Sequence, residues 1–135
     1  MSQLSNEELV FMNRRKQLRH KCIDYAIVGY NYLKNKKLEQ IVNIQVKRHL
    51  INETDPNYDP YHYYIEIKVK KNENQLRKVI IDNEGSYNFY FYKDRYKPKK
   101  IQKIGHKNLQ NAYKLVENDF IKIVENDIDY NLRNI

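Results

Sequence analysis

The chain has little of what usually marks a cofactor, metal or disulfide site. It contains one cysteine, three glycines, three prolines and no tryptophan. A single cysteine excludes an intrachain disulfide and a cluster of thiolate ligands, and it is typical of a reducing compartment. Three isolated glycines cannot form a glycine-rich phosphate-binding loop. We therefore predict a protein without a cofactor.

Long apolar runs are missing as well. No stretch approaches the roughly 18 residues of a membrane span, and the N-terminal residues MSQLSNEELV lack the charged start and apolar middle of a secretion signal. We expect an intracellular protein, cytoplasmic or nuclear, without a membrane partner. Its 135 residues, 41% of them hydrophobic, are enough for a single domain that spans residues 1–135.

Helical periodicity marks both ends of the chain. Ser5 and Glu8 form a capping-box pattern that should begin a helix over residues 6–34. Gly29 predicts a bend or a close packing contact within this helix. Apolar residues return at helical spacing from Leu109, which predicts a closing helix of about 20 residues.

Between the helices the hydrophobic period changes to two, which is typical of half-buried strands. We place strands at residues 42–46, 63–69, 77–81 and 87–92, the last of them in the aromatic run YNFYFY. Two Asp-Pro pairs make residues 52–60 a loop. The order predicts an α+β fold with an N-terminal helix, a four-stranded antiparallel β-meander and a C-terminal helix packed on the sheet.

Positive charge dominates the chain and is clustered. Lys and Arg number 25 against 17 Asp and Glu, which gives a formal net charge of +8. Part of this charge can reflect AT-rich coding, which favours Lys, Asn, Ile and Tyr, rather than a binding surface. One basic cluster lies on the first helix, and the other lies in residues 93–107, which we read as a loop before the last helix.

These clusters are the candidate phosphate contacts of a nucleic-acid-binding site, and the alternative is a solvated loop. The candidate residues are Arg14, Arg15, Lys16, Arg19, Lys93, Arg95, Tyr96, Lys97, Lys99, Lys100, Lys103 and Lys107. The last helix is acidic instead, with Glu117, Asp119, Glu125, Asp127 and Asp129. It can clamp onto the basic first helix or contact another copy of the chain, and the oligomeric state stays open.

The polar face of the sheet offers a second element for binding. It would carry Tyr64, Lys68 and Lys70 beside Tyr90 and Tyr92. Bases can stack on such aromatic and basic sheet faces. The alternative is that Tyr90 and Tyr92 lie under a helix as core residues, with their hydroxyls hydrogen-bonded.

Two short stretches resemble known families. Asp55, Glu66 and Lys68 resemble the acidic pair and lysine of restriction-endonuclease-like nucleases. The resemblance implies that the two carboxylates hold a divalent cation and that Lys68 helps to place the attacking water. The chain departs from that family because Asp55 lies in the proline-bounded loop and the strand runs into a hairpin instead of a helix.

The sequence DPYHYYIEIKVKK, followed by basic residues and a closing helix, is similar to the double-stranded-RNA-binding domain. That family has a helix, three strands and a helix that opens with lysines. The lysines at the matching place are Lys99, Lys100, Lys103 and Lys107. The extra aromatic strand and the absence of a glycine-rich turn depart from the family.

The remaining reactive residues predict neither a metal site nor a catalytic site. The histidines His20, His49, His62 and His106 lack a spacing that would aim two of them at one ion. Cys22 lies on the apolar stripe of the first helix, which predicts a buried, inert thiol.

The leading hypothesis is a small non-enzymatic module that binds nucleic acid, with RNA slightly favoured because of the tyrosines. The first alternative is a protein-interaction or regulatory module of a virus or mobile element that docks on an acidic host protein or a larger assembly. The second alternative is the metal-dependent nuclease.

Overall fold

The N-terminal helical segment forms two helices instead of one. A computed structural model describes residues 5–51, 59–133 and 135. The capping box is present at the start of α1 (Asn6–Leu18), where the Glu8 N–H donates to Ser5 Oγ at 3.1 Å. The chain then turns at His20, whose φ of 62° is left-handed, before α2 (Cys22–Lys36) begins. The prediction of one continuous helix is therefore wrong.

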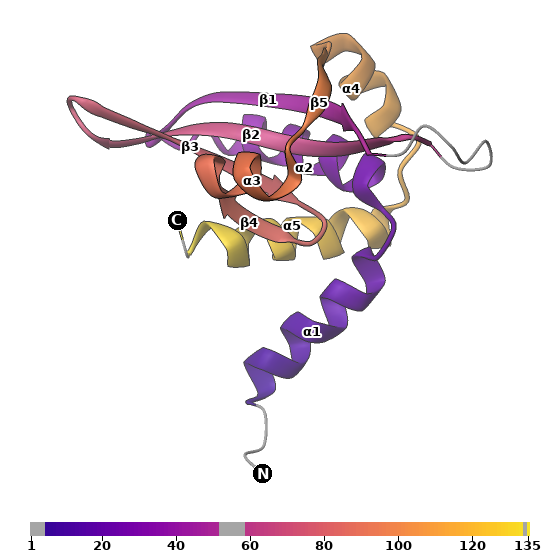
Figure 1. Ribbon diagram of the computed structural model, residues 1–135. Helices are drawn as coiled ribbons and strands as arrows, with labels where there is room; N and C mark the ends of the chain where they lie inside the picture. The colour runs from indigo at the N-terminus through magenta and orange to yellow at the C-terminus, as the bar shows by residue number, and fades with distance from the viewer. Residues whose placement is uncertain (1–4, 52–58, 134) are drawn as a thin grey trace.

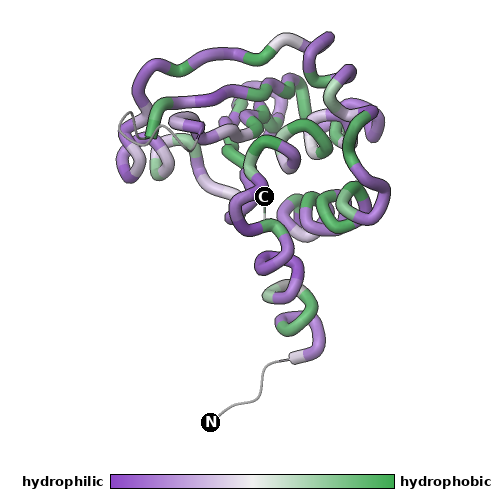
Figure 2. The backbone as a smooth tube through the Cα atoms, turned by 90° about the vertical axis from the view of Figure 1, so that its right-hand side faces the viewer, coloured by the Kyte–Doolittle hydropathy of each residue, from purple (hydrophilic) through white to green (hydrophobic). Residues whose placement is uncertain are grey.

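The break between the two helices lets them pack on different partners. Helix α2 lies on the sheet, while α1 contacts the last helix. Leu18 is fully buried at the break, which anchors the end of α1 in the core. Figures 1 and 2 both show the start of α1 projecting away from the rest of the chain.

One antiparallel sheet of five strands lies at the centre of the fold, in the order β4-β3-β2-β1-β5 (Figure 1). The strands are β1 (Ile41–Leu50), β2 (Tyr61–Asn72), β3 (Gln75–Asp82), β4 (Gly85–Asn88) and β5 (Lys99–Ile104). The predicted α+β class is confirmed, and β1 to β4 form a meander. The prediction missed the fifth strand, which pairs with β1 at the other edge of the sheet.

The aromatic run predicted as the fourth strand is mostly helical. Strand β4 ends at Asn88, whose side chain accepts a hydrogen bond from the Tyr90 N–H at 2.9 Å. This N-cap begins α3 (Phe89–Tyr96). A local capping bond and the packing of one helical face thus override the strand propensity of the aromatic residues.

The basic segment at residues 93–107 is not a loop either. It contains the end of α3, all of β5 and the start of α4 (His106–Tyr113). Strand β5 pairs antiparallel with β1, and its one partly buried residue, Ile104, lies opposite the buried Val46. The predicted closing helix is also divided, into α4 and α5 (Asn118–Leu132), by a turn at residues 114–116.

The main core lies between one face of the sheet and the layer formed by α2, α4 and α5. Ile65 and Ile67 of β2 are fully buried there against α2. Gly29 allows the close approach, because a Cβ atom at this position would lie 2.5 Å from Ile65 Cδ1. The predicted close packing contact at Gly29 is confirmed. Helix α3 covers part of the opposite face, where Tyr64, Ile80 and Tyr92 form a smaller core.

Candidate nucleic-acid interface

The face of the sheet opposite α2 gathers lysines because side chains alternate along each strand. In the register of β1 and β2, Lys47 is paired with Tyr64. In the register of β2 and β3, Lys68 is paired with Lys78, and Glu66 is paired with Ile80. These residues share one face, so the polar positions of three strands and the exposed part of α3 form one surface.

A groove of about 490 Å³ lies on this surface between α3 and the strands. Its cationic lining comes from both sides, with Lys47 and Lys78 on the strands, Lys93 on α3 and Lys97 at the C-cap of α3. The apolar and aromatic lining residues are Tyr64, Ile80, Phe89, Tyr92, Pro98 and Ile101. The groove thus combines four cations with a partly aromatic floor.

Two carboxylates reduce the positive charge of the groove. Glu66 is only 5% exposed, and its Oε2 accepts from Lys47 Nζ at 2.9 Å. This ion pair compensates the buried Glu66 carboxylate, so Lys47 stabilises the fold as well as lining the groove. Asp94 is the second acidic lining residue. Lys78 lies over the Phe89 ring at 4.8 Å from its centroid, which holds a cation beside an aromatic surface.

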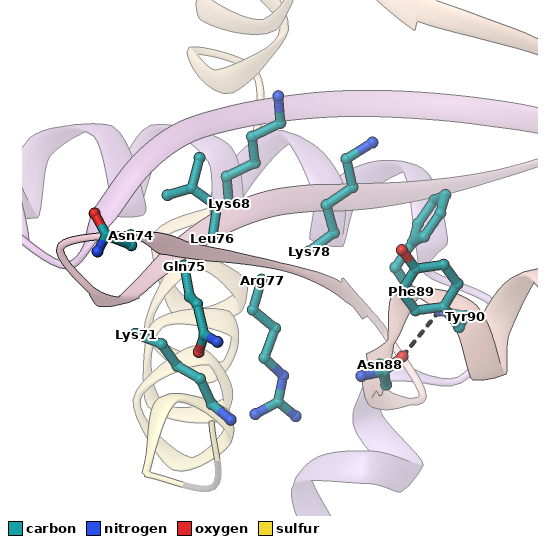
Figure 3. A pocket seen from close by; sticks show the side chains of 10 residues that line it. All are labelled: Lys68, Lys71, Asn74, Gln75, Leu76, Arg77, Lys78, Asn88, Phe89 and Tyr90. Carbon is teal, nitrogen blue, oxygen red and sulfur yellow. Dashed lines mark hydrogen bonds between the residues drawn. The ribbon is translucent and has the colours of Figure 1, made fainter.

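A second hollow, of about 640 Å³, continues from the groove toward the β2–β3 hairpin and shares Lys78 and Phe89 with it. Figure 3 shows Lys68 and Lys78 extending to the same side of the hairpin, while Lys71 and Arg77 extend to the other side. Its lining residues are Lys68, Lys71, Asn74, Gln75, Leu76, Arg77, Lys78, Asn88, Phe89 and Tyr90. The hollow runs along the part of β3 that has no β4 partner.

The tyrosines predicted for base stacking divide into core and surface residues. Tyr64 and Tyr92 are 3% and 2% exposed, and their ring centroids lie 5.3 Å apart. Burial raises the pKa of both hydroxyls. These two rings therefore belong to the core, as the alternative interpretation stated for Tyr92. Tyr90 is 73% exposed beside the hollow, so it alone of these three rings is open to a base.

The predicted contacts on the first helix fall into two groups. Arg15 is bound to Asp127 at 3.0 Å and donates to the Asn83 carbonyl oxygen at 2.6 Å. Arg14 lies over the Tyr130 ring at 5.6 Å from its centroid. Both arginines thus pack against α5, and the predicted internal clamp between the acidic helix and the basic helix is confirmed. Lys16 and Arg19 are exposed, but α1 does not line either hollow.

The predicted contacts at residues 93–107 are spread over three elements. Lys93 and Lys97 line the groove. Tyr96 packs on Tyr92 with ring centroids 4.7 Å apart and remains 39% exposed. The others lie on the exposed part of α3, on β5 and at the start of α4: Arg95, Lys99, Lys100, Lys103 and Lys107.

Three residues of the candidate interface escaped prediction: Lys47, Lys78 and Phe89. The two lysines occupy polar positions in the alternating patterns of predicted strands. The alternation therefore predicts that each lysine points away from the core. The pairing register that brings them together is a property of the whole sheet and has no local signature. Phe89 was not predicted as an interface residue because its segment was interpreted as a strand.

The nuclease-like residues do not form a metal site within the part of the chain that the structure describes. Asp55 lies outside the described residues, and Glu66 is bound to Lys47. Among residues 5–51, 59–133 and 135, no group of three His, Cys, Asp or Glu side chains is placed to hold a metal ion.

Comparison with known proteins assigns no family to this chain. No protein-family model matches the sequence, and no curated protein or solved structure matches it. No helix in the described ranges is long and apolar enough to cross a membrane.

Proposed function

We propose that the protein binds single-stranded nucleic acid, with RNA slightly favoured, on the sheet face beside α3. The observation that carries this proposal is the exposed Tyr90 ring, which lines the same hollow as Lys68 and Lys78; this hollow shares Lys78 and Phe89 with the groove. Single-strand binders combine a cationic groove for the backbone with aromatic rings for the bases.

The two kinds of side chain would act differently. Lys78, Lys93 and Lys97 are arranged to contact phosphates, which gives affinity and salt dependence but no sequence preference. Tyr90 and the partly exposed Phe89 present ring faces on which unpaired bases can stack, at roughly 1 to 3 kcal/mol per base. The bases of a duplex are already stacked, so the proposal favours single strands.

The test is the affinity of the protein for fluorescent single-stranded and double-stranded RNA and DNA across a salt series. We expect tighter binding to single strands than to duplexes. The logarithm of the association constant should decrease linearly with the logarithm of the salt concentration. Lys93→Ala/Lys97→Ala should weaken binding at least tenfold at low salt. The matched control is Lys114→Ala/Lys122→Ala, which removes the same charge from exposed positions outside both hollows. Equal effects of the two variants would refute the proposed groove.

A second candidate function, protein interaction, is favoured by the apolar residues that α1 exposes. Leu9, Val10 and Met12 of this helix are 51%, 53% and 47% exposed. Neighbouring exposed apolar residues often mark a protein contact. A complex that survives nuclease treatment and is lost in Leu9→Ser/Val10→Ser would support this function. A complex that nuclease abolishes would support nucleic-acid binding instead.

A further inference from the structure

A buried carboxylate lies in the groove beside α3, among aromatic and apolar side chains. Glu66 is only 5% exposed. It lines the groove together with Tyr64, Ile80 and Tyr92. Buried polar atoms normally have a hydrogen-bond partner, and a buried charge without one is costly. The partners of Glu66 therefore show what the groove can still bind.

Only one oxygen of this carboxylate is used by the protein. Oε2 of Glu66 accepts from Lys47 Nζ at 2.9 Å. Within residues 5–51, 59–133 and 135, no hydrogen bond reaches Oε1. This oxygen is not enclosed by protein atoms, so it opens into the groove that Glu66 lines. A carboxylate has about four lone-pair sites, so most of the acceptor capacity of Glu66 is left for a ligand.

The pair of Lys47 and Glu66 presents an ordered hydrogen-bonding edge to the groove. Lys47 Nζ donates to Oε2 and not to Oε1, so an ammonium donor and two acceptor oxygens follow one another in that order. The ammonium group has two further N–H donors. A ligand that fits this edge presents one acceptor and then two donors. The Watson–Crick edge of guanine has this pattern, with O6 followed by the N–H groups at N1 and N2.

The other bases do not present this pattern. Adenine N1 and cytosine N3 are acceptors at the middle position, where each would face a carboxylate oxygen. Uracil has a single N–H between two carbonyl oxygens, so one carbonyl would face the second carboxylate oxygen. A site whose buried polar groups are left unpaired or opposed by the wrong base discriminates strongly against that base.

The rest of the groove suits a planar base that carries a phosphate. Phe89 and Pro98 are half-buried lining residues that offer apolar surface to the ring. Lys93 and Lys97 are exposed lining residues, and neither is paired with a carboxylate in the part of the chain that the structure describes. The volume of about 490 Å³ is typical of a small-ligand pocket, so the groove can hold one nucleotide.

We propose that this groove is a guanine-specific pocket, in which Glu66 accepts from the N–H groups at N1 and N2 and Lys47 donates to O6. The inference rests on the proposed single-strand binding and adds a base preference to it. One guanine of the strand enters the groove, while its neighbours contact Lys68 and Tyr90 along the connected hollow. A free guanine nucleotide has the same chemistry, and the test separates the two sources.

The test compares the affinities of the wild-type protein for short oligouridines that carry one central guanosine, inosine, adenosine or cytidine. We expect guanosine to give about tenfold tighter binding than adenosine or cytidine, because a bidentate contact to a base discriminates by about this factor or more. Inosine lacks the amino group at N2, so its affinity should fall between those of guanosine and adenosine. These measurements use the unaltered chain and do not depend on the folding of a variant.

The role of Glu66 is tested by Glu66→Gln, which places an amide donor against the donors of guanine. This variant should lose the preference for guanosine and still bind plain oligouridine, because Lys93 and Lys97 are retained. The matched control is Glu117→Gln, which removes the same charge from an exposed position outside the groove and should keep the preference. Circular dichroism checks that each variant is folded.

A second arm measures the binding of guanosine monophosphate, with adenosine monophosphate as its control. Binding of the guanosine-containing strand that is tighter than binding of guanosine monophosphate would assign the pocket to a nucleotide within a strand. Binding of guanosine monophosphate without binding of any strand would support the pocket and refute single-strand binding.

Two results would overturn the guanine pocket and leave single-strand binding standing. One is equal affinity for all of the test nucleotides, and the other is a preference for guanosine that persists in folded Glu66→Gln. Absence of binding to every strand and to both monophosphates would overturn the pocket together with single-strand binding.

Discussion

At the residue scale, two buried polar clusters pair side chains that are distant in the sequence. One joins His62 to Asp82, and the other joins Tyr25, Asp127 and Asn131 to Arg15. Buried polar groups are costly unless they are paired, so each cluster makes stability depend on particular partners.

The His62–Asp82 pair predicts a pH-dependent stability. The pKa of His62 is about 9 in the folded chain, against its ordinary value of 6.5. The stabilisation from this group is therefore fully present below about pH 6.5 and is lost as pH increases through about 9. We expect the free energy of unfolding to decrease by on the order of 3 kcal/mol across this window.

Urea denaturation across this pH window measures the effect. The variant His62→Gln should show a flatter profile over the same range, because it lacks the titrating group. A wild-type profile as flat as that of His62→Gln would show that the pair does not have the predicted linkage.

The Arg15–Asp127 pair predicts a structural role for an arginine first expected to contact nucleic acid. The Asp127 side chain is fully buried, and burial raises its pKa against the opposing effects of Tyr25 and Arg15. Arg15→Ala should cost about 3 kcal/mol of unfolding free energy, because it leaves a buried carboxylate without its cation. Arg19→Ala, on an exposed position nearby, should change stability by less than about 0.5 kcal/mol.

At the element scale, the alternating strands could be predicted and the aromatic helix could not. Ile65 and Ile67 alternate with polar residues and are fully buried against α2, so pattern and structure agree. The run that begins at Phe89 has the composition of a strand, but the Asn88 cap and the packing of Tyr92 on Tyr64 decide its conformation. The Asn88 cap is a local contact, whereas the packing of Tyr92 on Tyr64 is tertiary and has no signature in the sequence.

The N-cap of α3 predicts a link between this helix and binding. Asn88→Ala removes the acceptor of the Tyr90 N–H and should destabilise the start of α3 by about 1 kcal/mol. Because Lys93 lies on α3 and Lys97 is its C-cap residue, the affinity for single-stranded RNA should fall as well. Asn88→Asp retains the acceptor and should restore the stability. Loss of stability without any change in affinity would separate the helix from the binding site.

At the scale of the whole molecule, the two basic clusters of the sequence do not form one surface. The arginines of α1 pack against α5, while Lys93 and Lys97 lie across the groove from the strands. The cations that join them there, Lys47 and Lys78, come from the sheet. Sequence clustering was therefore a poor guide to the surface, because strand register and helix packing redistribute neighbouring charges.

The sequence predicted a buried Cys22, because this residue lies among the apolar residues of the first helical segment. The structure leaves its side chain partly exposed at the first position of α2. The prediction assumed one continuous helix, and the break before α2 places Cys22 at a helix end instead.

The most direct test of the central claim is a map of the residues whose nuclear magnetic resonance signals change when single-stranded RNA is added. We predict that the changes concentrate on Tyr90, Lys93, Lys97 and the adjoining positions of β2 and β3, and that added salt reverses them. Changes confined to α1 and α5, or no changes at low salt, would contradict the claim that the sheet face beside α3 binds nucleic acid.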